Sequence, residues 1–234
     1  MGMGENLYGR SRTIHYKIVT SKERVMCTMN FREPDRVPAW LGASPEFINK
    51  AIKSYGLADE ENLLEMLGDD FRRVLAPYVH PNPADSENTP FGVSRAGIGY
   101  GMAMNHPLAE AGLDEAQGYK WPDPDFVDIS RCRLEAEKHY DKYAILGGDW
   151  SPFWHDLIDL LGMENLFILM YMEPGLVEYV IGRIVDYYME VNTRIFEEAA
   201  DLIDIFFIGN DFGSASGPLI DESLFDRFVV PQLK

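Results

Sequence analysis

The segment AADLIDIFFIGNDFGSASGPL, residues 199–219, is the clearest indicator of the fold of this chain. Its apolar run, residues 203–208, stops abruptly at Gly209. A short and nearly continuous apolar run of this kind is typical of a strand buried on both faces of a parallel sheet. Asn210 and Asp211 follow it, and α/β folds hold their chemistry at the carboxyl ends of such strands. We therefore predict a parallel α/β sheet with a functional site just beyond residue 208.

Three further segments are predicted strands, at residues 36–42, 71–79 and 143–147. The spacing of apolar residues and the placement of capping residues predict helices at 21–31, 45–54, 59–67, 128–140, 152–161, 164–171, 174–200 and from 222 to the last residue. Repeated strand–turn–helix units favour either an α/β barrel or a doubly wound sheet. Residues 1–18 are predicted to be a flexible leader, and residues 19–234 a single domain.

Residues 81–125 interrupt this pattern, because they are rich in proline and glycine and have few helical periods. We predict a loop-rich insertion there, with a hairpin at 92–104 that covers one end of the fold. Loop regions of this length are usually functional, and the sequence does not say whether this one acts as a lid.

Composition restricts the function classes. The 234 residues are 46% hydrophobic and carry a formal net charge of -17. Such an acidic chain repels nucleic acid and anionic lipid, and no apolar run is long enough for a membrane span. The amino-terminal residues have no apolar signal region, and two distant cysteines, Cys27 and Cys132, suit a reducing compartment. We therefore expect a cytoplasmic protein that acts on a small molecule.

Asn210 and Asp211 are the foremost candidate catalytic residues, since they follow the strand at 203–208. A carboxylate and an amide at a strand end can face a substrate. The alternative is that they only stabilise a turn before Gly213.

A second group of candidates follows the strand at 143–147. Asp149 and His155 are candidates for acid–base work, and Trp150 and Trp154 for substrate binding. The alternative is that Asp149 caps a helix and the tryptophans fill the core. Trp40 and Tyr78, at two other strand ends, are further candidates for the pocket wall. Arg72 and Arg73 could hold an anion, although solvated arginines are the commoner case, and the scattered histidines and cysteines predict no metal site.

Several segments, in this order along the chain, resemble the uroporphyrinogen decarboxylase-like superfamily: SKERVMCTMNFREPDRVPAWLG at 21–42, LLEMLGDDFRRV at 63–74, HPLAEA and KWPDPD at 106–125, and GNDFGSASGPLIDESLFDRFVVPQLK at 209–234. The resemblance implies a (β/α)8 barrel. The superfamily contains true uroporphyrinogen decarboxylases and a branch of cobalamin-dependent methyltransferases, which move a methyl group between a corrinoid protein and a thiol or a pterin.

The resemblance favours the methyltransferase branch. True decarboxylases carry a QAGR segment after the first strand and an FSD aspartate in the second unit, whereas this chain has GASPEF at 42–47 and no FSD. A decarboxylase acting on another carboxylated substrate, and a non-catalytic half-barrel with a binding or assembly role, are the alternatives. In the methyltransferase branch, zinc is held by an H-x-C motif and a later cysteine, which would lie beyond Lys234.

The same resemblance implies that residues 19–234 form the amino-terminal half of a barrel, with about four parallel strands. A half-barrel exposes sheet edges. We therefore expect a fragment of a longer protein, or a chain that self-associates or pairs with a partner to complete its sheet, and a corrinoid protein as a further partner.

Overall fold

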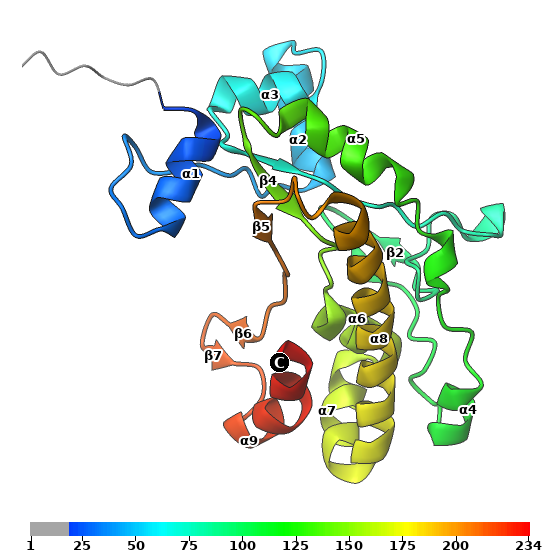
Figure 1. The fold of residues 1–234 in the computed structure, drawn as a ribbon. Helices are drawn as coiled ribbons and strands as arrows, with labels where there is room; N and C mark the ends of the chain where they lie inside the picture. Colours follow the sequence, from blue (N-terminus) through cyan, green and yellow to red (C-terminus); the bar gives the residue numbers. More distant parts are fainter. Residues whose placement is uncertain (1–18) are drawn as a thin grey trace, which may run out of the picture.

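A computed structural model describes residues 19–234, and Figure 1 shows their arrangement. The predicted leader, residues 1–18, lies outside the described residues. A parallel sheet holds the strands β1 (Phe71–Arg73), β4 (Ala144–Gly147) and β5 (Ile205–Phe206), in the order β1-β4-β5. In register, Phe71 lies opposite Ala144, and Leu146 lies opposite Ile205. The parallel α/β class is thus confirmed, and the described strands form part of a sheet and no closed barrel.

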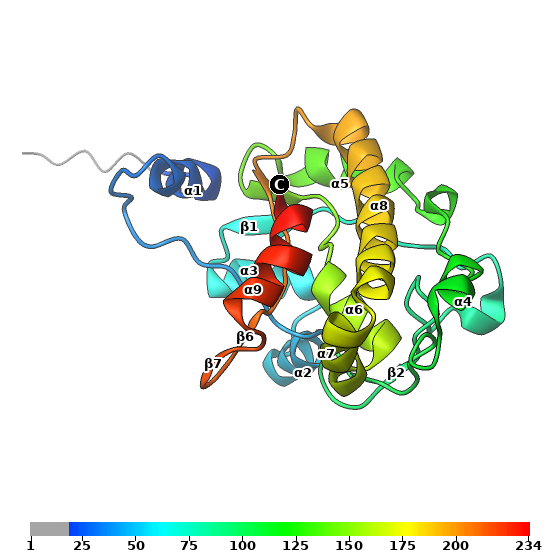
Figure 2. The same ribbon diagram turned by 90° about the horizontal axis from the view of Figure 1, so that it is seen from below.

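Helices connect the strands of this sheet. Helix α5 (Ser130–His139) leads into β4, and α6 (Phe153–Leu161), α7 (Met163–Met172) and α8 (Pro174–Ala199) join β4 to β5. All four were expected from the sequence, α8 from its apolar stripe. Figure 2, turned by 90°, shows the long helix α8 running beside α6 and α7. Its apolar stripe is buried against them and supplies much of the core.

The amino-terminal helices α1 (Ser21–Met29), α2 (Pro45–Tyr55) and α3 (Glu60–Leu67) begin at side chains that accept backbone N–H groups. Thr20 forms a capping box with Glu23, Ser44 accepts the N–H of Phe47, and Asp59 accepts the N–H of Asn62. Glycines with positive φ end α2 and α3. These local signals explain why the sequence placed the helices correctly.

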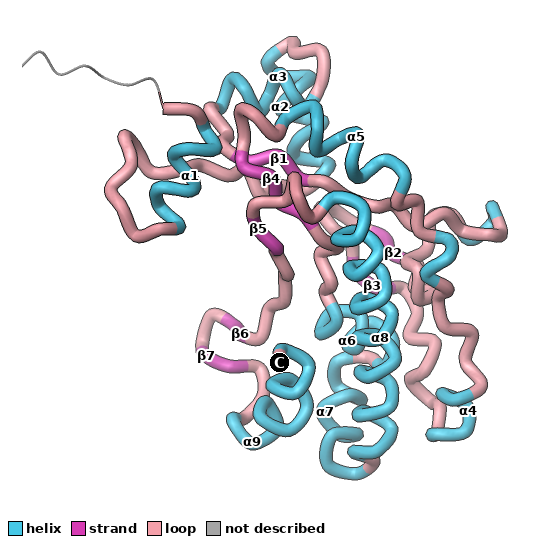
Figure 3. Tube along the Cα trace, in the orientation of Figure 1, coloured by secondary structure: helices cyan, strands magenta, loops and turns pink. Residues whose placement is uncertain are grey.

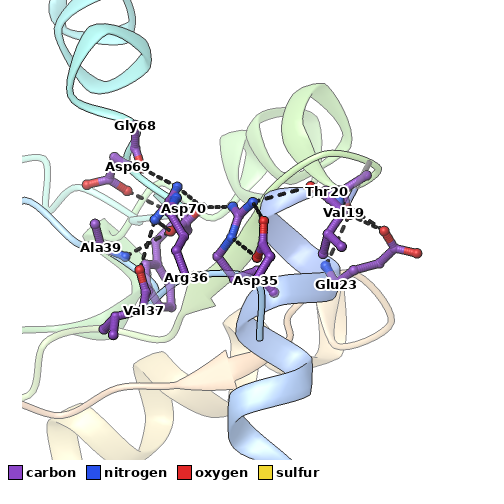
Figure 4. A network of polar contacts seen from close by, with 12 residues as sticks. Val19, Thr20, Glu23, Asp35, Arg36, Val37, Ala39, Gly68, Asp69 and Asp70 are labelled. Atoms are coloured by element: carbon purple, nitrogen blue, oxygen red, sulfur yellow. Dashed lines mark hydrogen bonds and ion pairs between the residues drawn. The ribbon is translucent and has the colours of Figure 1, made fainter. Parts of the chain in front are cut away.

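The prediction of a strand at 36–42 was wrong. This segment is extended, but its backbone N–H groups bind mainly to side chains and not to a neighbouring strand (Figure 4). The Asp70 carboxylate accepts the N–H of Ala39, and the Asp69 carboxylate accepts the N–H of Leu41. The two carboxylates occupy backbone donors that a neighbouring strand would otherwise use.

Two other strand predictions were too long. Of residues 71–79, β1 takes only the first three, and the rest is an irregular segment with a single bridge from Tyr78 to Val127. Of residues 203–208, β5 takes two, and Phe206 is half exposed. The expected burial on both faces fails because β5 is the outer strand of the sheet in the described part of the chain, with β4 as its neighbour there (Figure 3).

Residues 81–125 consist mostly of loops and turns. Residues 81–125 hold a short antiparallel hairpin, β2 (Arg95–Ala96) and β3 (Met102–Ala103), where one was expected. Its other elements are short: η1 (Pro83–Asp85), α4 (Leu113–Gln117) and η2 (Pro124–Phe126).

After β5 the chain forms a small hairpin and an irregular helical segment. The hairpin consists of β6 (Gly213–Ser214) and β7 (Gly217–Pro218). The predicted continuous helix from 222 is divided into α9 (Glu222–Leu224), a π-helical turn η3 (Phe225–Val229) and η4 (Val230–Leu233). Pro231 interrupts regular α-helical bonding there because it has no N–H to donate. Phe228 and Val229 join the core.

A buried polar network fastens the amino end of β1 (Figure 4). Asp70 is fully buried and accepts hydrogen bonds from Arg24 of α1, from Arg36 and from the Ala39 N–H. Arg24 is buried too, and its other donors bind both carboxylate oxygens of Asp35 at 2.7 and 2.8 Å. The network therefore ties α1 and the segment before α2 to the sheet.

Candidate functional site

A pocket of about 320 Å³ opens at the carboxyl ends of β1 and β4 and is closed on one side by α8. Its lining residues are Arg73, Leu75, Ala76, Pro77, Tyr78, Pro90, Asp149, Trp150, Tyr187 and Tyr188. The strand ends were the predicted place for a site, because parallel strands bring their carboxyl ends to one edge of the sheet. The volume lies at the lower end of the range for ligand pockets, about 300–1,000 Å³.

Two successive arginines of β1 have different environments. Arg72 is buried, binds both oxygens of Glu61 at 2.7 Å and lies 3.6 Å from the centre of the Tyr143 ring. Arg73 is half-buried in the pocket wall, with its guanidinium carbon 4.4 Å from the centre of the Trp150 ring. Successive side chains of a strand point to opposite faces, which separates the two. The expectation of solvated surface arginines was therefore wrong for both.

The turn after β4 holds Asp149 in the pocket wall. Its N–H donates to Oδ1 of Asn192 at 2.7 Å, and its Oδ1 accepts the N–H of Ser151 at 2.9 Å. Burial raises the pKa of the Asp149 carboxyl, and the nearby Arg73 charge only partly opposes this. Asp149 can therefore hold a proton closer to neutral pH than an exposed aspartate.

Asn192 is a site residue that the sequence analysis missed. It lies on the buried stripe of α8 and also donates from Nδ2 to Oγ of Ser151 at 2.9 Å. The available signal was a lone amide among the apolar residues of that stripe, since a buried polar group needs a partner.

Trp150 forms a wall of the pocket and packs on the backbone at Gly209. The Gly209 N–H donates to the Trp150 carbonyl at 3.0 Å. A Cβ atom at Gly209 would lie 1.6 Å from Nε1 of Trp150, so any side chain there must displace the indole. The glycine that ends the apolar run at 203–208 is thus needed for the close approach of Trp150.

The structure gives Asn210 a structural role. Its Oδ1 accepts the N–H of Trp154 at 2.9 Å, and its Nδ2 donates to the carbonyl of Ser151 at 3.1 Å. The amide therefore caps the start of α6, whose own N-cap residue is a proline without a capping side chain. Asp211 is exposed and lies 3.6 Å from Nε2 of His155, outside the pocket lining.

The four aromatic candidates have three different environments. Trp150 and Tyr78 line the pocket. Trp154 is fully buried in the core, so its predicted role in substrate binding is corrected to packing. Trp40 is 42% exposed, contacts the ring of Phe207 at 5.2 Å and is not a lining residue.

A buried acid behind the pocket was also missed. Asp156 of α6 is buried and accepts the hydroxyl hydrogen of Tyr188, a lining residue. Burial raises the pKa of Asp156 to about 7. The available signal was an aspartate among the apolar residues of the helix at 152–161. Ionisable residues are rarely fully buried, so an acid at such a position is unusual.

The family resemblance implies zinc ligands beyond Lys234, outside this chain. Among residues 19–234 no group of three or more histidine, cysteine or acidic side chains could hold a metal. Cys27 is half-buried and donates to the Glu33 carbonyl, whereas Cys132 is fully buried and burial raises the pKa of its thiol to about 11. No helix within the same range is long and apolar enough to cross a membrane.

Comparison with known proteins identifies a shared fold. No protein-family model and no curated protein sequence matches the chain. A solved structure of a methyltransferase from Methanosarcina mazei matches it with a TM-score of 0.59 and 17% sequence identity. The match covers 92% of this chain and 65% of the methyltransferase chain, so this chain spans slightly less than two thirds of that length. This chain has a methyltransferase-like α/β fold. At this identity the likeness concerns the fold, and membership of the uroporphyrinogen decarboxylase-like superfamily stays a prediction.

Proposed function

We propose that this chain takes part in a methyl transfer between a corrinoid and a thiol or a pterin, and that the pocket binds the small-molecule substrate. The observation that carries the proposal is the fold shared with a methyltransferase over 92% of the chain. The pocket adds support, because it lies where parallel α/β folds place their ligands.

The pocket residues suit binding and orientation of the methyl acceptor. In the transfer, the bond from the methyl carbon to the donor breaks, and its electron pair stays with the donor. A new bond forms between the methyl carbon and the acceptor atom, which loses its proton. We place Asp149, the one carboxyl group of the wall, next to this proton, which passes to its ionised carboxylate; the Asp149 backbone is fixed by Asn192. No step of this proposal uses zinc.

Methyl transfer from methylcobalamin to 2-mercaptoethanol, followed by the change in corrin absorbance, tests the proposal. We expect a protein-dependent rate that falls at least tenfold in Gly209→Ala, because the new Cβ displaces Trp150 from the pocket wall. Gly213→Ala is the matched control, since a Cβ there meets only ordinary contacts, with the nearest atom 3.7 Å away. The same loss in both variants, or no protein-dependent transfer by the folded chain, would contradict the proposal. Release of carbon dioxide from uroporphyrinogen would favour the decarboxylase alternative instead.

We further propose that a second chain completes the sheet beside β5. Within residues 19–234, β5 pairs with β4 on one side, and Phe206 and Ile208 are 50% and 41% exposed. An outer strand with exposed apolar side chains is a site for pairing with another chain. This arrangement also supports the alternative of a binding or assembly role.

Light scattering over a range of concentrations tests this association. We expect the mass to rise with concentration, and the rise to be weakened at least severalfold by Ile208→Lys, because a lysine at a strand edge opposes pairing. Ile168→Lys on α7 is the control, since Ile168 is 59% exposed and remote from the sheet edge. A monodisperse monomer at all concentrations would overturn the proposal.

A further inference from the structure

Arg73 differs from the other arginines of the described chain in being half-buried without an acceptor. Every other arginine in residues 19–234 pairs with a carboxylate, except the exposed Arg32. The Arg73 guanidinium contacts the Trp150 ring, and none of the N–H groups of this guanidinium has a hydrogen-bond acceptor among the described residues. Burial lowers the pKa of Arg73, and the charge of the lining residue Asp149 opposes this lowering. Asp149 nevertheless lies outside ion-pair distance of Arg73. A guanidinium group stays protonated in proteins, so the pocket wall carries a positive charge with free donors.

A second donor faces the same pocket. Tyr187 of α8 is 6% exposed and lines the cavity, and its hydroxyl has no hydrogen-bond partner among residues 19–234. Its ring is held by edge contacts with Phe91 at 5.4 Å and Tyr188 at 5.3 Å. The Tyr187 hydroxyl is therefore a donor that is free to bind an acceptor on a ligand in the pocket.

The rest of the wall is suited to an apolar body. The wall contains three aliphatic side chains, those of Leu75, Pro77 and Pro90. It also contains the aromatic rings of Tyr78 and Trp150. The wall also contains one acid, Asp149, which would repel an anion in its ionised form. The positive charge of Arg73 in the same wall opposes this repulsion.

We propose that this pocket is a binding site for a small organic carboxylate: Arg73 holds the carboxylate, the Tyr187 hydroxyl donates to it, and the apolar body lies against Tyr78 and Trp150. A guanidinium fork matches two carboxylate oxygens, and charge-assisted bonds of this kind are stronger than neutral ones. The assignment of this carboxylate as the substrate rests on the proposed methyl transfer. The binding of the carboxylate does not rest on that proposal, because it is measured without turnover.

Ligand-observed NMR and calorimetry with benzoate as the probe test the site. We expect saturable binding of benzoate, at least tenfold weaker binding of its neutral analogue benzamide, and weaker binding of inorganic phosphate, which has no apolar body. Arg73→Gln should weaken benzoate binding at least tenfold, and Tyr187→Phe about threefold or more, because each removes one donor. Arg32→Gln is the control for removal of a positive charge from an exposed, unpaired arginine.

Circular dichroism verifies folding, and Arg73→Lys provides a second variant that keeps the charge. We expect Arg73→Lys to bind benzoate more tightly than Arg73→Gln and more weakly than the unaltered protein, since lysine lacks the planar fork. Equal affinity for benzoate and benzamide, or equal losses in Arg73→Gln and Arg32→Gln, would overturn the proposal. Benzoate binding that depends on Arg73, without any methyl transfer, would support the anion site and remove the proposed function.

Discussion

Asp70→Asn is expected to lower the free energy of unfolding by about 3–5 kcal/mol, because it removes the buried charge that pairs with Arg24 and Arg36 and leaves Arg24 only the partly exposed Asp35 as a charged partner. Asp70 is fully buried and accepts hydrogen bonds from Arg24, Arg36 and the Ala39 N–H. Burial alone would raise the pKa of Asp70, but these hydrogen bonds lower it below its usual value. Urea unfolding followed by circular dichroism measures the loss, which is a large part of the 5–15 kcal/mol typical of a domain.

Asp35→Asn is the matched control, because Asp35 binds the same guanidinium, that of Arg24, from the exposed side. The Asp35 side chain is 41% exposed, so water and salt screen its ion pair, and we expect a clearly smaller loss. A loss in Asp70→Asn no larger than that in Asp35→Asn would show that the buried network contributes little. Both residues lie at the amino end of β1, so the pocket of the variants that stay folded should bind benzoate as before.

Asp156→Asn is expected to raise the free energy of unfolding at pH 7. It should also remove the decrease in this free energy that the unaltered protein shows between about pH 4 and 7. Burial raises the pKa of Asp156 from 3.8 to about 7 in the folded chain. The folded chain therefore holds a proton that the unfolded chain has lost, and this contribution to stability is complete below about pH 4 and disappears as the pH rises through 7. At about 1.4 kcal/mol for each pKa unit, the full effect is roughly 4 kcal/mol.

The measurement is the difference in unfolding free energy between the two proteins at several pH values. Asp226→Asn is the control, because Asp226 is exposed and has no hydrogen bond or ion pair within residues 19–234. Groups with lowered pKa values, such as Asp35 at about 2, lose their contribution at lower pH and so do not mask the effect. A difference that stays constant from pH 4 to 7 would contradict the prediction.

Much of the site was predictable from local sequence. Asp149, Trp150 and Tyr78 were expected at strand ends, and all three line the pocket. Arg73 was considered only as a solvated charge, because neither burial nor the absence of a partner can be seen in a sequence. Asn210 had the expected position beyond the strand, but its amide is used by the backbone of the turn after β4, some 56 residues earlier in the chain.

The sequence by itself determined most of the longer helices and the parallel α/β class. Capping residues, αL glycines and 3.6-residue apolar spacing act within a few residues, so they can be read locally. The tertiary structure decided which segments became strands and which side chains met. Asp69 and Asp70 occupy the N–H groups of the segment at 36–42, and Asn192 of α8 fixes Asp149. Such contacts join residues far apart in the chain, and their energies depend on burial, which arises only when the elements pack.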